Sequence, residues 1–148
     1  MNIEDLIKEL DINLIIDSIE KDEGCIYVNC HKTISEHKCP FCGNSSSSVH
    51  SMYVRTIADL PLQNNEVKLR LSVHKYFCKN ENCSFTTFSE EYDFVEPKAV
   101  RTKRLDNYIK NIGLRNNSMD AVRTLKETGI DISSNTVINI VKKNKTNP

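Results

Sequence analysis

The run CPFCG occupies residues 39–43, and the run FCKNENCSF occupies residues 77–85. Each run holds a pair of cysteines, separated by two residues in the first run and by four in the second. Such a turn brings two sulfur atoms onto one ion, and two turns complete the tetrahedron of thiolates that structural Zn²⁺ prefers. Four thiolates leave no open position on the metal, so we expect a structural and not a catalytic role. The predicted ligands, as opposed to four buried free thiols, are Cys39, Cys42, Cys78 and Cys83.

The residues between the two cysteine pairs are patterned as β-strands. Residues 66–77 alternate apolar and polar side chains and run into the second cysteine pair, as a half-buried antiparallel strand does. Residues 49–57 predict another strand, which the Leu60-Pro61 pair should end, and residues 85–88 predict a short strand after the second pair. We therefore expect a small antiparallel-β zinc ribbon.

The residues before the first cysteine pair predict a helix and a hairpin. Apolar side chains recur at helical spacing over residues 3–10, which indicates a short amphipathic helix. Residues 13–20 and 25–32 are typical of two strands joined by a turn at 21–24. Gly24 can adopt the positive φ that such turns require.

Two cysteines lie outside the predicted zinc site. Cys25, Cys30, His31 and His37 are the candidates for a second metal site, but Cys25 and Cys30 should point to opposite faces of one strand. We therefore interpret these two cysteines as small buried apolar side chains. A zinc deaminase is excluded because that class needs P-C-x-x-C and H-x-E runs, whereas this sequence has Cys-Pro and no H-x-E.

The formal net charge is zero, but charge is unevenly distributed along the chain. Residues 1–30 carry a balance of −6, residues 31–97 a balance of −1, and residues 98–148 a balance of +7. The basic third indicates contact with a polyanion, unless it is only a solvated helical surface. Because no apolar run approaches the ~18 residues of a membrane helix and the acidic N-terminus lacks signal-peptide features, we expect a cytoplasmic protein.

From Thr102 onward the apolar period changes from two to about 3.6 residues, which predicts helices. The first helix should follow Thr102 as its N-cap and end near Gly113 as its C′ residue. The second should begin near Asn117 and stop at Gly129, and the third should begin at Ser133. The short, glycine-containing link TGIDIS between the last two is typical of a helix-turn-helix.

The third of these helices carries polar side chains suited to DNA. The first turn of a recognition helix meets base edges, asparagine can pair with adenine, and lysine suits phosphate. The alternative is a polar helix face that touches nothing. The predicted contacts are Ser134, Asn135, Asn139, Lys142 and Lys143.

A basic run precedes the first helix of this unit. It is either an arm on the DNA backbone or minor groove, or a solvated linker, and its predicted contact residues are Arg101, Lys103 and Arg104. The ribbon either contacts DNA through the polar face of its strand or braces the helical unit. That polar face carries Lys68, Arg70 and His74.

The order of these motifs resembles the N-terminal part of a bacterial insertion-sequence transposase family, the ISL-three type. The resemblance covers roughly residues 37–143. It rests on the ordered runs CPFCG, VHSMYVRTIADLP, VKLRLSVHKYFC followed by Cys83, FVEPKAVRTKRL and ISSNTVINIV. It implies a zinc ribbon and a helix-turn-helix that bind the terminal inverted repeats of the element, with the metal on the same four cysteines. Family members continue into an RNase H-like catalytic domain with acidic Mg²⁺ ligands. This sequence stops at Pro148, so we expect that it does not cut or join DNA by itself.

These observations predict an α+β fold, a small antiparallel-β zinc ribbon followed by a three-helix helix-turn-helix unit, at residues 1–97 and 98–148. The expected partner is double-stranded DNA, and the chain could also associate with a second copy of itself or with a full-length transposase. We expect neither a membrane nor a small-molecule substrate. Two alternatives stay open. One is a protein-interaction module, for which Ile138, off the apolar stripe, is an indication. The other is a stand-alone transcription regulator built from the same parts.

Overall fold

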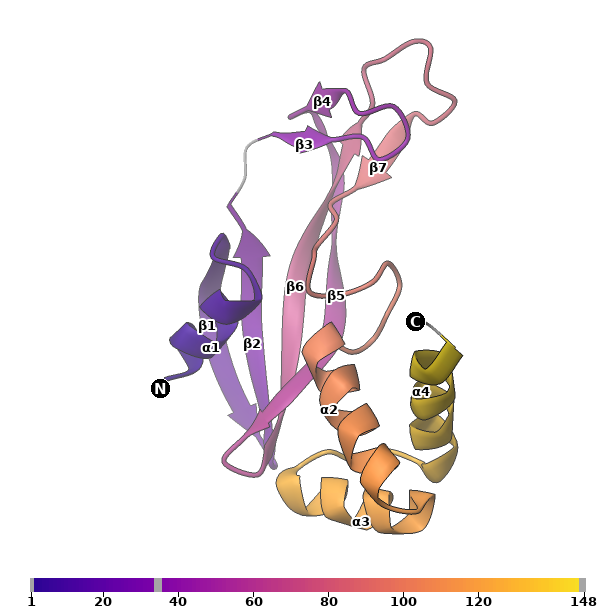
Figure 1. Cartoon of the computed structure of the whole chain (residues 1–148). Coiled ribbons are helices and arrows are strands. Elements are labelled where there is room, and N and C mark those ends of the chain that lie inside the picture. The colour runs from indigo at the N-terminus through magenta and orange to yellow at the C-terminus, as the bar shows by residue number, and fades with distance from the viewer. Residues whose placement is uncertain (1, 34–35, 147–148) are drawn as a thin grey trace.

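The computed structural model describes residues 2–33 and 36–146, which form one mixed sheet, a small hairpin and four helices (Figure 1). The cysteine-bearing turns lie at one end of the sheet, and the last three helices lie beside its other end (Figure 1). The elements are α1 (Ile3–Leu10), β1 (Leu14–Asp22), β2 (Cys25–Lys32), β3 (His37–Lys38), β4 (Ser45–Ser46), β5 (Val49–Leu62), β6 (Asn65–Phe77), β7 (Thr87–Ser89), α2 (Lys103–Arg115), α3 (Ser118–Thr128) and α4 (Ser134–Thr146).

The α+β class is confirmed, but the expectation of a small, purely antiparallel ribbon is wrong. The sheet runs in the order β1-β2-β6-β5, with β7 also paired to β6, and β2 is parallel to β6. The N-terminal hairpin therefore belongs to the same sheet as the strands between the cysteine pairs. The pattern of each strand shows which face is apolar, but it does not show which edges of two hairpins meet. Which edges pair depends on how the apolar faces of both hairpins are buried in one core.

Two-residue turns close both long hairpins. Glu23 and Gly24 have φ of 43° and 81°, and Gln63 and Asn64 have φ of 51° and 63°. Positive φ at both central residues matches the twist of the flanking strands and is typical of tight hairpins. The predicted N-terminal hairpin is thus confirmed, although β1 extends to Asp22 and its turn is shorter than expected.

The prediction that the Leu60-Pro61 pair ends a strand is wrong, because β5 continues to Leu62. β5 is an edge strand, and its register with β6 shifts between Asp59 and Leu62. A proline at an irregular point of an edge strand costs no ladder hydrogen bond, so the strand can continue through it. The short strand after the second cysteine pair is β7, which lies slightly later than the predicted 85–88.

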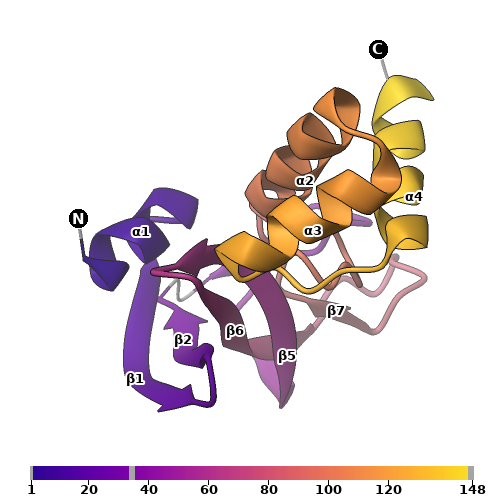
Figure 2. The same ribbon diagram turned by 90° about the horizontal axis from the view of Figure 1, so that it is seen from below.

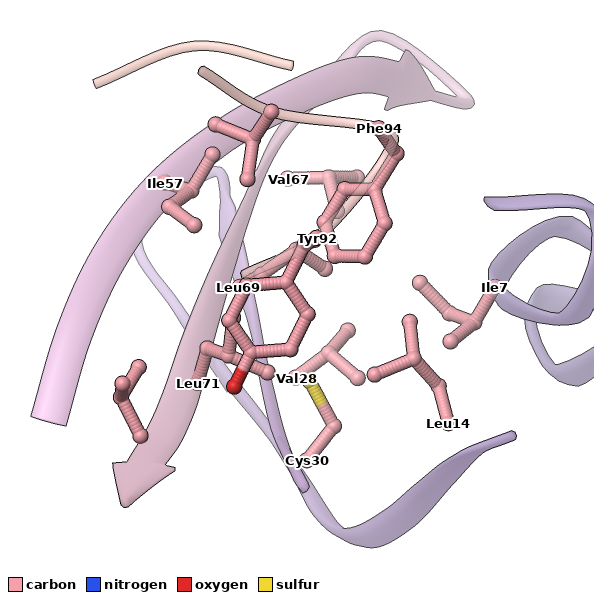
Figure 3. Close-up of a cluster of buried hydrophobic side chains, with 12 residues drawn as sticks. Ile7, Leu14, Val28, Cys30, Ile57, Val67, Leu69, Leu71, Tyr92 and Phe94 are labelled. Atoms are coloured by element: carbon pink, nitrogen blue, oxygen red, sulfur yellow. The ribbon is translucent and has the colours of Figure 1, made fainter. Parts of the chain in front are cut away.

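The main core lies on the face of the sheet that α1 and residues 92–95 cover (Figure 3). Ile7 from α1 and Tyr92 and Phe94 from the covering segment pack over Leu69 and Leu71 of β6. Leu69 and Leu71 are fully buried, as their alternation in the sequence predicts. The remaining buried members are Leu14, Val28, Cys30, Ile57, Val67, Val73 and Val95.

The last three helices enclose a second core beside β5 (Figure 2). It contains Leu105 and Ile109 of α2, Leu125 of α3, and Val137 and Ile140 of α4. Ala58 and Leu60 of β5 pack against this cluster from the sheet. The helices therefore dock on the sheet through apolar contacts. None of the described helices has the length and apolar character that a membrane span requires.

Local capping signals set the starts of three helices and the end of one, as predicted. The Thr102 and Asn117 side chains accept hydrogen bonds from Leu105 N and Asp120 N, and Ser133 Oγ accepts from Thr136 N. Gly129 ends α3 with φ 101°, which a residue with a Cβ adopts only at a cost.

Gly113 is not a C′ residue, contrary to the prediction, because α2 continues to Arg115. A Cβ at Gly113 would lie 2.7 Å from Val141 Cγ2 and 3.0 Å from Val137 Cγ1. The glycine therefore allows α4 to approach α2 closely, a role that helix-end rules do not reveal.

A buried carboxylate joins the helices to the sheet. Asp59 of β5 accepts hydrogen bonds from Thr102 Oγ1 at 2.8 Å and from Arg104 Nε at 2.9 Å, and it also pairs with the second arm of the same guanidinium. Arg104 Nη1 donates to Leu6 O at 3.1 Å. One arginine at the start of α2 thus connects α1, β5 and the helical cluster.

Candidate metal centre and nucleic-acid interface

The four predicted cysteine ligands meet at the end of the sheet. Their sulfur atoms all lie within 4.8 Å of one another, with Cys39 Sγ 4.0 Å from Cys83 Sγ and Cys42 Sγ 3.6 Å from Cys78 Sγ. With Zn–S bonds of about 2.3 Å, the sulfur atoms of a regular tetrahedron would be ~3.8 Å apart. The observed separations match that arrangement, and they are far longer than a disulfide bond. The residues therefore fit a zinc ion.

Two tight turns present these sulfur atoms. In the first, Gly43 N donates to Cys39 O at 2.8 Å, and Gly43 adopts φ 79°, which its missing side chain permits. The second follows β6 directly, so the strand aims Cys78 into the site. There Cys83 N donates to Asn80 O at 3.0 Å and closes the turn. Local backbone bonding within each run thus fixes where its two thiols point.

The thiols of this cluster have unequal proton affinities. Hydrogen bonds from the Asn44 backbone and the Asn80 side chain lower the pKa of Cys42 to about 6. The Asn80 backbone amide also acts to lower the pKa of Cys78, but burial and the neighbouring thiols outweigh it and raise that pKa to about 12. Four thiols this close cannot all ionise unaided. A bound Zn²⁺ supplies the positive charge that lets every ligating thiol lose its proton.

Aromatic packing supports the two turns. The rings of Phe41 and Phe85, one from each cysteine run, stack with centroids 3.5 Å apart. Beneath the site, Cys39, Tyr76 and Phe88 form a small buried cluster separate from the main core. A metal at this point would fasten the β3–β4 hairpin to β6 and β7. Because four thiolates fill the coordination shell, such a site stabilises structure and leaves no position for a substrate.

The two remaining cysteines are buried in β2, away from the four-cysteine site. Cys30 belongs to the main core and is fully buried, and Cys25 is 7% exposed. Burial raises the pKa of the Cys30 thiol to about 12. This thiol stays protonated at neutral pH and packs as a small apolar side chain.

Sequence reasoning missed a buried carboxylate beside the metal site. Glu90 Oε1 accepts from the backbone N and from Nδ1 of His74, both at 2.7 Å, and Glu90 Oε2 lies 4.0 Å from His37 Nε2. The His37 ring stacks on Tyr76 with centroids 4.3 Å apart. Glu90 therefore ties the end of β6 to the first cysteine turn. Glu90 alternates with the buried Phe88, Tyr92 and Phe94, whereas Glu91 and Asp93 are exposed, so a period-two pattern is the signal that could have placed it inside.

The predicted DNA-contacting residues of the third helix lie on α4. Asn135, Asn139, Lys142 and Lys143 are exposed, and Ser134 is half-buried at the first position of the helix. The opposite side of α4 is buried through Val137 and Ile140. The structure therefore turns the polar face of this helix outward.

The basic residues around the start of α2 are held by acidic partners within the chain. Arg101 Nε lies 2.6 Å from Asp106 Oδ1, and Lys103 Nζ lies 3.5 Å from Glu96 Oε1. Arg104 is the most deeply engaged, through its bonds to Asp59. The interactions of Arg101 and Lys103 are partly or largely exposed and can exchange, whereas the Asp59 side chain is 2% exposed.

Residues 35–83 match the family described as the zinc-finger of transposase IS204/IS1001/IS1096/IS1165. The match contains both cysteine pairs and ends at the last predicted ligand, Cys83. This part of the chain is a zinc ribbon of the type found in those transposases, with a four-cysteine metal site. No curated protein and no solved structure matches the chain.

Proposed function

We propose that this chain is the zinc-dependent DNA-binding part of a transposase and recognises the terminal inverted repeats of an insertion sequence. The observation that carries the proposal is the exposed polar face of α4 in the basic third of a chain whose ribbon matches a transposase zinc-finger. Zinc stabilises the ribbon, the helices read the DNA, and neither part cuts or joins strands. Such a protein would act on DNA in the bacterial cytoplasm.

In this proposal α3 and α4 form a helix-turn-helix, and α4 enters the major groove. Residues 129–133 join the two helices, and their cores pack together through Leu125 and Val137. Asn135, in the first turn of α4, reads a base, and Asn139 one turn later reaches a neighbouring base or a phosphate. Lys142 and Lys143 lie towards the other end of the helix and contact phosphates.

The distribution of charge along the chain also supports DNA contact through its C-terminal third. Residues 98–148 carry a balance of +7, whereas residues 1–30 carry −6 and would be repelled by DNA. The exposed ion pairs of Arg101 and Lys103 can open to let these side chains reach phosphates. We assign Arg104 a positioning role instead, because its guanidinium is already bonded to the buried Asp59.

Selection of bound sequences from random duplex DNA, followed by gel-shift titration at several salt concentrations, tests this function. Asn135→Ala should weaken binding to the selected site by about 1–3 kcal/mol and relax preference at one base pair. Lys143→Ala should weaken cognate and random DNA alike and reduce the salt slope by about one unit. The matched controls Asn107→Ala, exposed on α2, and Lys21→Ala, exposed on β1, should leave the salt slope unchanged.

If the selection returns no sequence and both α4 variants bind DNA like the parent, the DNA-reading assignment is wrong. The protein-interaction alternative then gains support from exposed apolar side chains on the helical unit. Leu114 is 48% exposed, Met119 64% and Ile138 36%. Substituting these three should then abolish capture of a partner while zinc content stays constant.

A further inference from the structure

The outer edge of β5 is open over half of its length. Ala58 N donates to Val100 O at 2.8 Å, and Thr102 N donates to Ala58 O at 3.0 Å, so the backbone groups of Ala58 point away from β6. The register of β5 with β6 is continuous from Ser51 to Asp59. Because the direction of backbone groups alternates along a strand, Met52 and Val54 also turn their N–H and C=O groups outward. Among the described residues of β5, only Ala58 has its outward-pointing N–H and C=O groups in backbone hydrogen bonds.

This open stretch has the character of an interaction surface. Exposed apolar side chains flank it, with Val49 53%, Met52 57%, Tyr53 43% and Val54 58% exposed. Residues 49–54 contain no Asp, Glu, Lys, Arg or Pro. Soluble proteins usually blunt a free edge with charges, proline or a bulge, because it can pair with another strand.

The opposite edge of the same sheet provides an internal comparison. β1 carries Asp17, Glu20, Lys21 and Asp22, and its register with β2 shifts between Ile16 and Ser18. These are the features that prevent strand pairing at an edge. The β1 edge therefore carries charges along its strand, whereas residues 51–54 of β5 carry none and pair with β6 without a shift. The register shift at this end of β5 lies before that stretch, between Val49 and Ser51.

A groove of about 730 Å³ lies along the open edge. Tyr53 and Arg55 of β5 line one side of it, and Pro97 and Val100 belong to the segment that forms the other side. Arg55 Nη2 holds that segment in place by donating to the backbone oxygens of Glu96 and Ala99. A strand paired to β5 would place alternate side chains in this groove, as in recognition by strand addition.

We propose that β5 of a second copy of this chain pairs antiparallel with this edge around Tyr53, forming a two-fold symmetric dimer. A two-fold axis at Tyr53 brings Met52 of one copy opposite Val54 of the other, so these residues exchange about four hydrogen bonds. No like charges face each other, since residues 49–54 are uncharged and the nearest charged residue, Arg55, lies opposite Ser51. The same strand serves as both surface and ligand, which a symmetric interface requires.

Sedimentation of the zinc-loaded full chain without DNA tests the dimer. The parent should shift with concentration from 17.0 kDa towards twice that mass. Val54→Lys should weaken the dimer roughly tenfold or more, because it places a charge in the paired edge. Ile19→Lys, at a 47% exposed position on the protected β1 edge, is the matched control and should dimerise like the parent.

A second variant separates strand pairing from a general apolar contact. The N–H of Val54 points outward, so Val54→Pro removes a donor to the partner strand while leaving the β5–β6 ladder intact. It should weaken the dimer as strongly as Val54→Lys. A parent that stays monomeric across micromolar concentrations, or equal effects of Val54→Lys and Ile19→Lys, would overturn the proposal. If this edge instead pairs with a strand from another protein, the parent chain alone would stay monomeric in this experiment. Since no DNA is used, the result is independent of the proposed DNA binding.

Discussion

Replacing Asp59 with alanine should strongly weaken the connection between the sheet and the three C-terminal helices. The Asp59 side chain is 2% exposed and accepts hydrogen bonds from Thr102 Oγ1 and from two nitrogens of Arg104. After the substitution, Arg104 keeps the Leu6 carbonyl and a 3.7 Å approach to Glu9, whose side chain is 54% exposed. A largely buried guanidinium would then lack its main counter-charge.

The cost follows from the burial of the pair. Removing one partner of a buried ion pair costs about 3–5 kcal/mol, and the 23% exposure of Arg104 favours the lower end of that range. The Thr102 hydroxyl also loses its acceptor, which adds about 1 kcal/mol. The total is about 4 kcal/mol. With a urea m-value of about 2–3 kcal/mol/M, the unfolding midpoint should fall by roughly 1.3–2 M.

Urea unfolding followed by circular dichroism in zinc-containing buffer measures this effect. Glu96→Ala is the control, because it removes the exposed ion pair with Lys103 at the same end of α2. Exposed pairs contribute less than about 1 kcal/mol, so the control should unfold close to the parent. If Asp59→Ala shifts the midpoint no more than Glu96→Ala does, the buried carboxylate does not connect the two parts.

The remaining predictions concern metal, helix packing and thiol reactivity. Elemental analysis should find one zinc per chain, which Cys39→Ser abolishes and Cys25→Ser leaves unchanged; an intact ribbon without zinc would contradict the site. Gly113→Ala should destabilise the protein by about 1–3 kcal/mol, because its Cβ would crowd Val141 Cγ2 at 2.7 Å, and thermal unfolding at or above the parent midpoint would refute that contact. The Cys30 thiol, whose pKa is raised by burial to about 12, should stay protonated and resist alkylation at pH 8 in the folded protein; mass spectrometry should detect modification only after denaturation.

Features that depend on neighbouring residues were predictable from the sequence. Each cysteine pair lies within one short turn, so spacing alone indicated that its two thiols converge. The caps at Thr102 and Asn117 and the stop at Gly129 are likewise local, because each satisfies backbone groups within one helical turn. The alternation in residues 66–77 predicted β6 for the same reason, since side-chain direction repeats along one strand.

Features that depend on contacts between distant segments were not predictable in this way. Pro61 ends a strand by local rules, but β5 lies at an edge where a missing N–H costs nothing. Local rules predict that a helix ends at Gly113, but in the structure its missing side chain lets α4 pack closely against α2. The role of Arg104 arises because the fold buries its partner Asp59, and no spacing in the sequence indicates that this aspartate will be enclosed.

The sequence by itself therefore determined the metal ligands, the starts of the last three helices and the apolar face of each strand, because these rest on turn geometry and periodicity over a few residues. Only the tertiary structure decided that β2 runs parallel to β6, that Asp59 receives Arg104, and that the edge of β5 stays open while the edge of β1 carries charge. Pairing of strands and burial of charge are set by the competition of all segments for one core. That competition is settled only when the whole chain is folded.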